Sequence, residues 1–326
     1  MTVKLTDPEK RLCNLLQGGV PISARPFADL AQSLDSDEET LLREVRRLKE
    51  AGIIRRIGPA VNARALGRVS TLVTAHVPQE DVRAVAGAVN ALEGVSHNYL
   101  RKHHYNLWFT LQADSAGEID YTLANLSAQF GTDFHNLPVE RTFKLAVRFD
   151  LEGEGRADRK DEAKVPGDKV VELSEKQKHI LSKLPGDLDV TAKPFDFLCE
   201  SGFDEREVVA TIGSLISTGV IRRIAAVLDY RKLGFTANVM FCCAVDGDKV
   251  VTAGENLARF AVVSHCYQRR TFEGWPYSLY AMMHARSMGE IQRVVDEFLE
   301  AEAIDSYELL PTEAELKKQP VRQNLP

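Results

Sequence analysis

The sequence predicts an α+β protein of two tandem homologous halves, each a winged helix-turn-helix followed by a ferredoxin-like βαββαβ domain. The first observation is an internal repeat, in which segments recur at a nearly constant spacing. The second is the group of short helical patterns that opens each half, and the third is the alternation of strand and helix patterns behind it. The matching segments are 24–27 with 192–195, 53–57 with 220–224, and 95–99 with 263–267.

The helices that open each half carry start and stop signals. An N-cap side chain followed three residues later by Glu or Gln predicts a helix start, because the two side chains satisfy free backbone N–H groups. Gly52 and Gly219 should end the third helix of each half, and an Ile-Arg-Arg-Ile strand follows each glycine. The predicted start pairs are Thr6 with Glu9, Ser36 with Glu39, Ser174 with Gln177, and Asp204 with Glu207.

The rest of each half predicts the order β-α-β-β-α-β. In the first half we expect strands at 69–77, 95–101, 105–112 and 136–147, with helices at 81–92 and 116–130. In the second half we expect strands at 237–245, 262–268, 277–284 and 304–310, with helices at 250–260 and 287–301. The domains should therefore span 1–62, 63–149, 173–229 and 230–326, with a charged, glycine-containing linker over 150–172.

The composition is that of a globular protein, with 326 residues of which 44% are hydrophobic and 27% charged. No apolar run reaches the roughly 18 residues of a membrane helix, and the N-terminus lacks the apolar region of a signal peptide. The five cysteines show no C-x-x-C spacing, so we expect neither a disulfide framework nor a metal site. We expect a cytoplasmic protein without membrane contact, and the net charge of −6 gives no overall attraction to nucleic acid.

One stretch holds more functional side chains than a turn between strands requires. Residues 95–109 read Val-Ser-His-Asn-Tyr-Leu-Arg-Lys-His-His-Tyr-Asn-Leu-Trp-Phe, and Val-Ser-His-x-Tyr-x-Arg returns at 263–269. Because side chains alternate along a strand, His97, Tyr99 and Arg101 should share one face. On the return strand we expect one face to carry Tyr105, Leu107 and Phe109, and the other to carry Asn106 and Trp108.

The order of domains resembles that of the Lrp/AsnC family of transcription regulators, over both halves. The hairpins are more specific. Residues 95–109 resemble the A-type subunit of the siroheme decarboxylases, and residues 263–280, with Trp275-Pro276-Tyr277, resemble the B-type subunit. Such subunits usually pair as heterodimers, and both types in one chain resemble the fused decarboxylases of d1-type haem synthesis.

The resemblance implies a carboxy-lyase that removes carbon dioxide from the C12 and C18 acetate groups of siroheme, giving 12,18-didecarboxysiroheme. It implies no cofactor, because the iron tetrapyrrole is the substrate. We expect the two halves to pair within the chain, and association of two chains into a homodimer remains open. Whether the pathway ends in haem d1 or haem b also remains open.

Siroheme is a flat ring with many carboxylates, so its site needs cations and aromatic walls. Loss of carbon dioxide leaves an electron pair that must be protonated, and histidine is the natural acid near neutral pH. The candidate catalytic residues are, in order, His103, His104, His97 and His265; axial ligation of the substrate iron is the alternative role for a histidine. The candidate substrate-binding residues are Arg101, Lys102, Tyr105, Asn106, Trp108, Tyr267, Arg269, Arg270, Trp275 and Tyr277.

Several of these residues could instead have a purely structural role. His97 and His265 on strands are equally typical of buried histidines bonded to the backbone, and Trp108 and Trp275 of an ordinary core. Arg55-Arg56 and Arg222-Arg223 are typical of wing or interface residues.

The two copies also differ. Ser278 stands where the first copy has Asn106, and Thr271 and Phe272 lie near where it has His103 and His104. One pocket could therefore carry both steps, or each pocket one.

Two other functions compete with the enzyme. A DNA-binding regulator that senses haem or a small molecule would need a basic recognition helix. The second half offers only Arg206 over 204–218, and the first half interleaves its four basic residues with glutamates, so we expect no functional DNA binding. A haem-binding carrier without catalysis is the third possibility.

Overall fold

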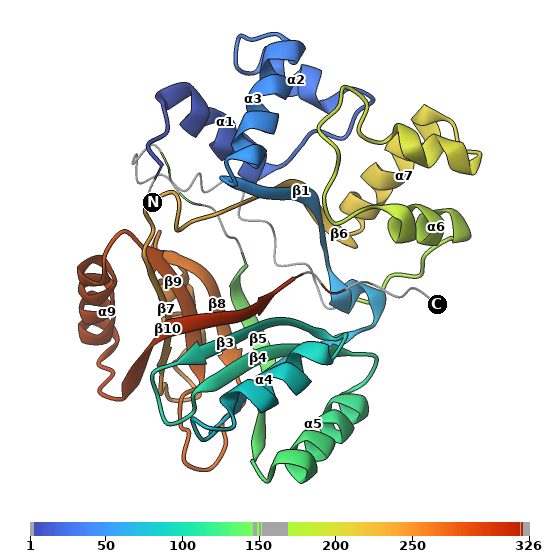
Figure 1. The fold of residues 1–326 in the computed structure, drawn as a ribbon. Coiled ribbons are helices and arrows are strands. Elements are labelled where there is room, and N and C mark those ends of the chain that lie inside the picture. The colour runs from blue at the N-terminus through green and yellow to red at the C-terminus, as the bar shows by residue number, and fades with distance from the viewer. Residues whose placement is uncertain (1–2, 146–148, 150, 152–168, 320, 322–326) are drawn as a thin grey trace.

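The structure is a computed structural model that describes residues 3–145, 149, 151, 169–319 and 321. Most of the predicted linker over 150–172, and the end of the strand predicted over 136–147, lie outside the described residues. The described helices and strands run through the predicted order twice, which confirms the fold class (Figure 1).

The first half opens with α1 (Asp7–Gly18), α2 (Pro26–Gln32) and α3 (Glu38–Glu50). The capping box of α1 is formed as predicted by Thr6 and Glu9. The predicted start of α3 at Ser36 is wrong by one residue. The carboxylate of Asp37 accepts from the N–H of Thr40 at 2.8 Å and so takes the N-cap position, while the Ser36 hydroxyl donates to the Asp37 carbonyl.

The second half opens with α6 (Glu175–Lys183), the short 3-10 helix η3 (Asp196–Ser201) and α7 (Glu205–Ser217). The predicted caps at Ser174 and Asp204 are both present. Gly219, like Gly52 in the first half, follows the third helix with a positive φ of +77°, a conformation that costs glycine little.

The two wings pair with each other. Strand β1 (Ile54–Val61) runs antiparallel to β6 (Ile221–Leu228), and this two-stranded sheet lies between the helices and the rest of the molecule (Figure 1). Helices of both halves bury their apolar faces in one shared core, which includes Leu16, Val45 and Leu215. The helix-turn-helix parts therefore form one unit.

The ferredoxin-like part of the first half consists of β2 (Val69–Ala75), α4 (Val82–Ala91), β3 (Val95–Arg101), β4 (Leu107–Ala113), α5 (Ala116–Phe130) and β5 (Phe134–Leu145). The second half repeats it with β7 (Ala237–Cys243), α8 (Val250–Ala258), β8 (Val263–Arg269), β9 (Leu279–Ala285), α9 (Met288–Glu302) and β10 (Tyr307–Lys318). The strand predicted over 304–310 is thus too short. Its last residues pair with β3 of the other half, a distant partner that leaves no local signal.

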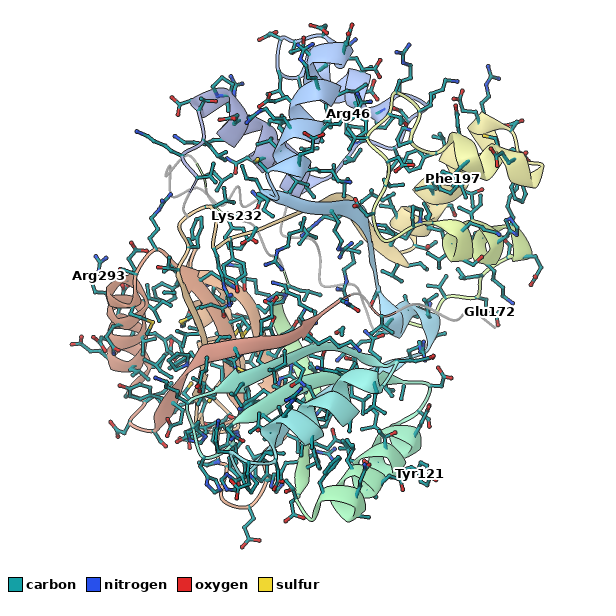
Figure 2. All side chains as sticks on the ribbon, viewed as in Figure 1. Arg46, Tyr121, Glu172, Phe197, Lys232 and Arg293 are labelled. Atoms are coloured by element: carbon teal, nitrogen blue, oxygen red, sulfur yellow. The ribbon has the colours of Figure 1, made fainter. Side chains whose placement is uncertain are left out.

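The eight strands close into a barrel in the order β10-β3-β4-β2-β5-β8-β9-β7. Two seams join the halves, because β5 pairs with β8 and β10 pairs with β3. The outward strand faces pack on the helices, as Val73 and Phe109 do in the first half and Phe241 and Met283 in the second. The inward faces of both sheets fill the barrel with side chains (Figure 2).

Candidate active site

The inward face of each repeated hairpin carries the same triad. His97, Tyr99 and Arg101 share this face on β3, as predicted, since Tyr99 is paired with inward Trp108 and Arg101 reaches across the barrel. The Arg101 guanidinium lies over the Tyr99 ring at 5.5 Å. The Arg269 guanidinium lies over the Tyr267 ring at 5.0 Å.

Both arginines tie the two halves together inside the barrel. Nη1 of Arg101 donates to the carbonyl of Leu310 on β10 at 2.6 Å. Nη1 of Arg269 donates to the carbonyl of Leu137 on β5 at 2.7 Å. In each, Nε is buried without a hydrogen-bond partner among the described residues, and burial lowers the pKa of both guanidinium groups.

A serine precedes each histidine of the triad and positions its ring. Ser96 Oγ lies 2.8 Å from Nδ1 of His97, and Ser264 Oγ lies 3.1 Å from Nδ1 of His265. Burial lowers the pKa of His97 to about 4 and that of His265 to about 3, so both rings are neutral at pH 7 in this state. Charge repulsion from Lys318 adds to the shift of His97, and repulsion from His284, His97 and Arg222 adds to that of His265.

A cavity of about 210 Å³ opens between the barrel and the end of the β1–β6 sheet. We call it the arginine cavity, because Arg64, Arg222 and Arg269 line it and no acidic residue does among the described lining residues. Arg269 and Tyr267 bring the triad of the second half to its wall. The other lining residues are Val61, Asn62, Ala63, Ser70, Thr71, Thr110, Gln112, Val139, Thr142 and Leu145.

The remaining predicted site residues lie at the hairpin end of the barrel, apart from the lining of this cavity. Trp108 and Trp275 are 1% and 2% exposed and contact each other at 5.7 Å between ring centroids. Tyr105 packs on Trp275, on the same side as Trp108. Its predicted face is therefore wrong, because β4 begins only at Leu107 and Tyr105 still belongs to the turn.

His103 and His104 lie in this same hairpin region. The imidazole of His103 contacts Trp275 edge-on at 5.3 Å, and that of His104 stacks on His76 at 4.1 Å. Tyr277 also packs on Trp275, at 4.7 Å. Lys102 and Arg270 are exposed at the two hairpin tips.

Asn106 has a structural role that its repeat partner shares. Its amide donates to the carbonyl of Val77 at 2.8 Å and accepts from the N–H of the same residue at 2.9 Å. Ser278 makes the same kind of bridge to Val245, donating to the carbonyl at 3.2 Å. Although the two copies have different residues at this position, both side chains hydrogen-bond the residue that lies just after the first strand of the domain, β2 or β7.

The sequence interpretation missed Arg64 and gave Arg222 little weight as a site residue. Arg222 belongs to the repeated Ile-Arg-Arg-Ile segment, which was a usable signal. Arg64 lies in the short 3-10 helix η1 (Ala63–Leu66) after the wing, where the sequence carries no such signal. Only the pairing of β1 with β6 brings these residues over the barrel. No group of three or more His, Cys, Asp or Glu side chains in the described part of the chain is placed to hold a metal ion, and the five cysteines are free.

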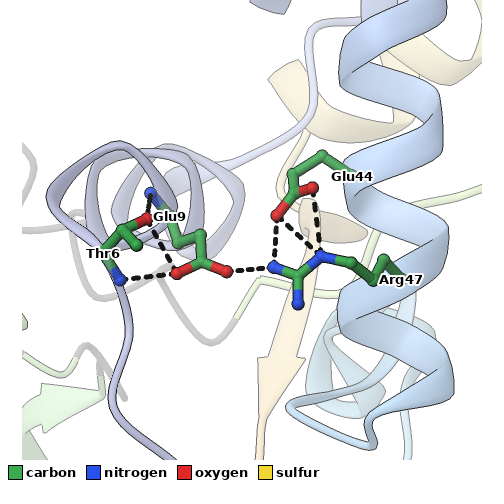
Figure 3. A network of polar contacts seen from close by, with 4 residues as sticks. All are labelled: Thr6, Glu9, Glu44 and Arg47. Carbon is green, nitrogen blue, oxygen red and sulfur yellow. Dashed lines mark hydrogen bonds and ion pairs between the residues drawn. The ribbon is translucent and has the colours of Figure 1, made fainter.

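The basic residues of α3 are engaged within the chain. Arg47 pairs with Glu44 and with Glu9 of the α1 capping box (Figure 3). Arg46, labelled in Figure 2, donates to the carbonyl of Val190 of the second half at 2.7 Å. Lys49 pairs with Asp187 of the second half at 2.7 Å. Arg46 and Lys49 thus hold the two helix-turn-helix parts against each other, and Arg47 joins α3 to α1 within the first half.

Comparison with known proteins covers most of the chain. Residues 65–144 and 232–317 match the model of an AsnC-like ligand binding domain, and residues 9–55 match that of a siroheme decarboxylase NirDL-like HTH domain. A siroheme decarboxylase of Hydrogenobacter thermophilus is 35% identical over 94% of this chain and 92% of its own. The siroheme decarboxylase alpha subunit of Desulfovibrio desulfuricans is 42% identical over 45% of this chain and 84% of its own.

Solved structures agree. The crystal structure of the siroheme decarboxylase NirDL covers 98% of this chain and 94% of its own, with a TM-score of 0.74 and 31% identity. A second, in co-complex with an iron-uroporphyrin III analogue, has a TM-score of 0.73 and 30% identity over 97% of this chain and 94% of its own. No described helix is long and apolar enough to cross a membrane. With both helix-turn-helix parts, both ligand-binding domains and both hairpins in place, this chain belongs to the siroheme decarboxylase family.

Proposed function

We propose that the protein decarboxylates siroheme at its C12 and C18 acetate groups to give 12,18-didecarboxysiroheme. The observation that carries the proposal is the arginine cavity, which gathers Arg64, Arg222 and Arg269 beside Tyr267 of the triad, with no acidic residue in its described lining. A polycarboxylate ring would bring negative charge to these arginines. A relative of the same architecture binds an iron-uroporphyrin III analogue, which is also a carboxylate-bearing tetrapyrrole.

Guanidinium groups suit this substrate because they bind carboxylates in two parallel hydrogen bonds. The chemical step requires that the reacting carboxylate lose its charge as carbon dioxide, so a strong ion pair to that carboxylate would slow the reaction. The arginines therefore serve best by holding the carboxylates that do not react. The reacting acetate group should then lie toward the histidines.

The step itself needs one proton. The bond from the side-chain carbon to its carboxylate breaks, the electron pair stays on that carbon, and a histidine proton converts the group to methyl. The conjugated ring can delocalise the electron pair, so the protein need not supply an electron sink. No further cofactor is proposed, because the iron belongs to the substrate.

His265 is the proton donor that the geometry favours. Its ring stacks at 6.1 Å on Tyr267, which lines the cavity, and its pKa responds to Arg222 of the same lining. His97 is the second candidate, because two hydrogen bonds link it to the cavity lining. Thr110, a lining residue, shares a hydrogen bond of 2.7 Å with the Ser96 hydroxyl, and the same hydroxyl contacts the His97 ring. Both rings are neutral without substrate, and an approaching carboxylate raises the pKa of an imidazole, so substrate binding would itself charge the acid.

His103 and His104 remain proposed alternatives, together with axial ligation of the substrate iron by a histidine. They would require the ring to reach the hairpin end, where Tyr105, Trp108, Trp275 and Tyr277 could flank it. Lys102 and Arg270 would then meet its outer carboxylates. Association of two chains into a homodimer likewise remains a proposal.

Anaerobic incubation with siroheme, followed by mass analysis of the tetrapyrrole, tests the proposal. Loss of two carbon dioxide units is the expected result. Tight binding with unchanged mass would contradict the enzyme and leave a haem-binding carrier, and a specific shift of promoter DNA would favour a regulator.

A further inference from the structure

A β-bulge turns one serine of each repeated hairpin toward the histidine that follows it. In β8 the pairing with β9 shifts by one residue between Val263 and His265, so Ser264 is the extra residue of the bulge. Strand β3 has the same shift around Ser96. Successive side chains of a regular strand point to opposite faces, and a bulge redirects one of them. Each serine hydroxyl can therefore contact the imidazole of the next residue.

The Ser264 hydroxyl has three hydrogen-bond neighbours. It lies 3.1 Å from the backbone carbonyl of Met282, 3.1 Å from Nδ1 of His265 and 3.2 Å from Nδ1 of His284. A hydroxyl has one proton to donate and two lone pairs that accept, and a carbonyl can only accept. All three contacts are hydrogen bonds only if the hydroxyl donates to Met282 and both imidazoles donate to the hydroxyl. This assigns the proton of both neutral rings to Nδ1 and leaves Nε2 unprotonated.

The surroundings keep His284 against Ser264 in a neutral state. Its ring packs edge-on against Tyr230 at 5.1 Å and against Phe149 at 5.6 Å. Burial lowers the pKa of His284 to about 4 and that of His265 to about 3. Repulsion from His284 contributes to the lowered pKa of His265. Since both rings donate to one oxygen, a positive charge on one ring disfavours a charge on the other.

The first half does not fix its histidine in the same way. Thr110 pairs with His97 as Met282 pairs with His265, and its hydroxyl lies 2.7 Å from that of Ser96. Ser96 lies 2.8 Å from Nδ1 of His97. Both hydroxyls can donate or accept, so the hydrogen bonds can run in either direction and His97 can carry its proton on either nitrogen. The two copies therefore differ in how firmly the tautomer is held.

We propose that Ser264 is a positioning residue that holds His265 in its Nδ1–H form, with His284 as the second donor to the same hydroxyl. This inference rests on the proposed function and deepens it. Nδ1 of His265 faces Ser264, and the half-buried ring is left with Nε2 to meet a ligand. The proton that reacts must therefore enter from solvent at Nε2. It leaves from Nε2 to the side-chain carbon, which holds the electron pair of the broken bond to the carboxylate.

This arrangement needs no rearrangement when His265 becomes charged. The hydroxyl already accepts from Nδ1, and the same hydrogen bond becomes stronger once the ring is an imidazolium. After the transfer the ring returns to the Nδ1–H form in which it began. Each turnover consumes one proton, and Nδ1 keeps its own proton throughout.

Nitrogen-15 NMR of the histidine side chains in the full-length protein tests the assignment without substrate. At pH 7 wild type should show His265 and His284 in the Nδ1–H form, with the two signals identified by their loss in His265→Gln and His284→Gln. Ser264→Ala removes the acceptor and should shift His265 toward the Nε2–H form, while the matched variant Ser96→Ala should leave His265 unchanged. A wild-type His265 in the Nε2–H form, or a tautomer that Ser264→Ala does not alter, would overturn the proposal.

Single-turnover kinetics with siroheme test the consequence for the reaction. Ser264→Ala should lower the turnover rate by about 10-fold, the weight of one hydrogen bond to a charged group, and leave the dissociation constant of siroheme unchanged. Ser264→Thr keeps the hydroxyl and should restore the rate, and circular dichroism identifies the folded variants. If wild type leaves siroheme unreacted, the proposed function itself fails. If wild type reacts and folded Ser264→Ala reacts equally fast, the positioning role alone fails.

Discussion

The two halves share a fold and a hairpin motif, yet their regions around the triads differ at a few positions. The repeated residues, Arg101 and Arg269 above all, make the same hydrogen bonds across the barrel in both copies. The non-repeated residues change the volume and charge beside the triads, as Ala63 in the cavity lining and the buried Tyr230 at the matching position show. In this duplicated protein the retained motif thus maintains the architecture, and the divergent positions distinguish the two regions.

Substitution of the triad histidines should change the turnover rate more than any other variant described here. His265→Gln should lower the turnover rate by about 10²- to 10⁴-fold, the usual contribution of a positioned general acid, with little change in substrate affinity. His97→Gln, farther from Arg222, should have a smaller effect. Single-turnover rates measured with siroheme in excess of its dissociation constant separate the two. Equal losses would mean that the copies are chemically equivalent, and an inactive His103→Ala with an active His265→Gln would move the acid to the hairpin end.

Low pH should reduce the free energy of unfolding, because both halves contain buried neutral histidines. His97 and His284 have their pKa lowered to about 4, and His265 to about 3, by burial, whereas an unfolded histidine titrates near 6.5. The unfolded chain therefore binds more protons, and the free energy of unfolding should fall as pH decreases from about 6.5 toward 4. Each histidine contributes a slope of up to about 1.4 kcal/mol per pH unit.

Urea denaturation between pH 7 and pH 4.5 measures this dependence. The variant His284→Gln, which copies Gln112 of the cavity side, should show a shallower slope than wild type. A free energy of unfolding that rises toward low pH would contradict the assignment of neutral buried rings.

The paired arginines should differ in their effect on stability. Arg55→Ala leaves Asp229 and Glu315 without their partner, and a loss of about 1 to 2 kcal/mol is expected for these partly exposed contacts. Arg222→Ala removes a cation that repels Arg64 and should change the free energy of unfolding by less than about 0.5 kcal/mol. Urea denaturation at pH 7 measures both, and a larger loss in Arg222→Ala than in Arg55→Ala would contradict this order.

The smallest effect on stability and rate is expected at position 278, where the two copies have different residues with the same hydrogen-bonding role. Ser278→Asn gives the second hairpin the residue of the first, and either side chain can bridge to the residue that follows the first strand. The free energy of unfolding and the reaction rate should both stay within experimental error, about 0.5 kcal/mol for the former. A marked loss of activity would assign this position a contact with substrate.

The sequence was informative wherever a signal is local. Helix caps, glycine stops and strand alternation placed most elements, and the alternation along β3 placed His97, Tyr99 and Arg101 on one face. The errors share one cause, which is pairing with distant segments. The extension of β10 to Lys318 depends on β3, and the site of Arg222 depends on the wing-to-wing sheet. The aromatic residues of the hairpins are typical of a ligand wall, but in the barrel Trp108 and Trp275 fill the core between the halves.

The two seams of the barrel have a consequence for how such a protein can evolve. A half alone would expose strand edges at β3 and β5, or at β8 and β10, which the other half covers here. Two separate subunits could satisfy these edges by pairing with themselves as well as with each other. Joining them in one chain fixes the stoichiometry at one to one and makes assembly independent of concentration. Both copies are then present in every molecule, so each is free to diverge while the barrel stays complete.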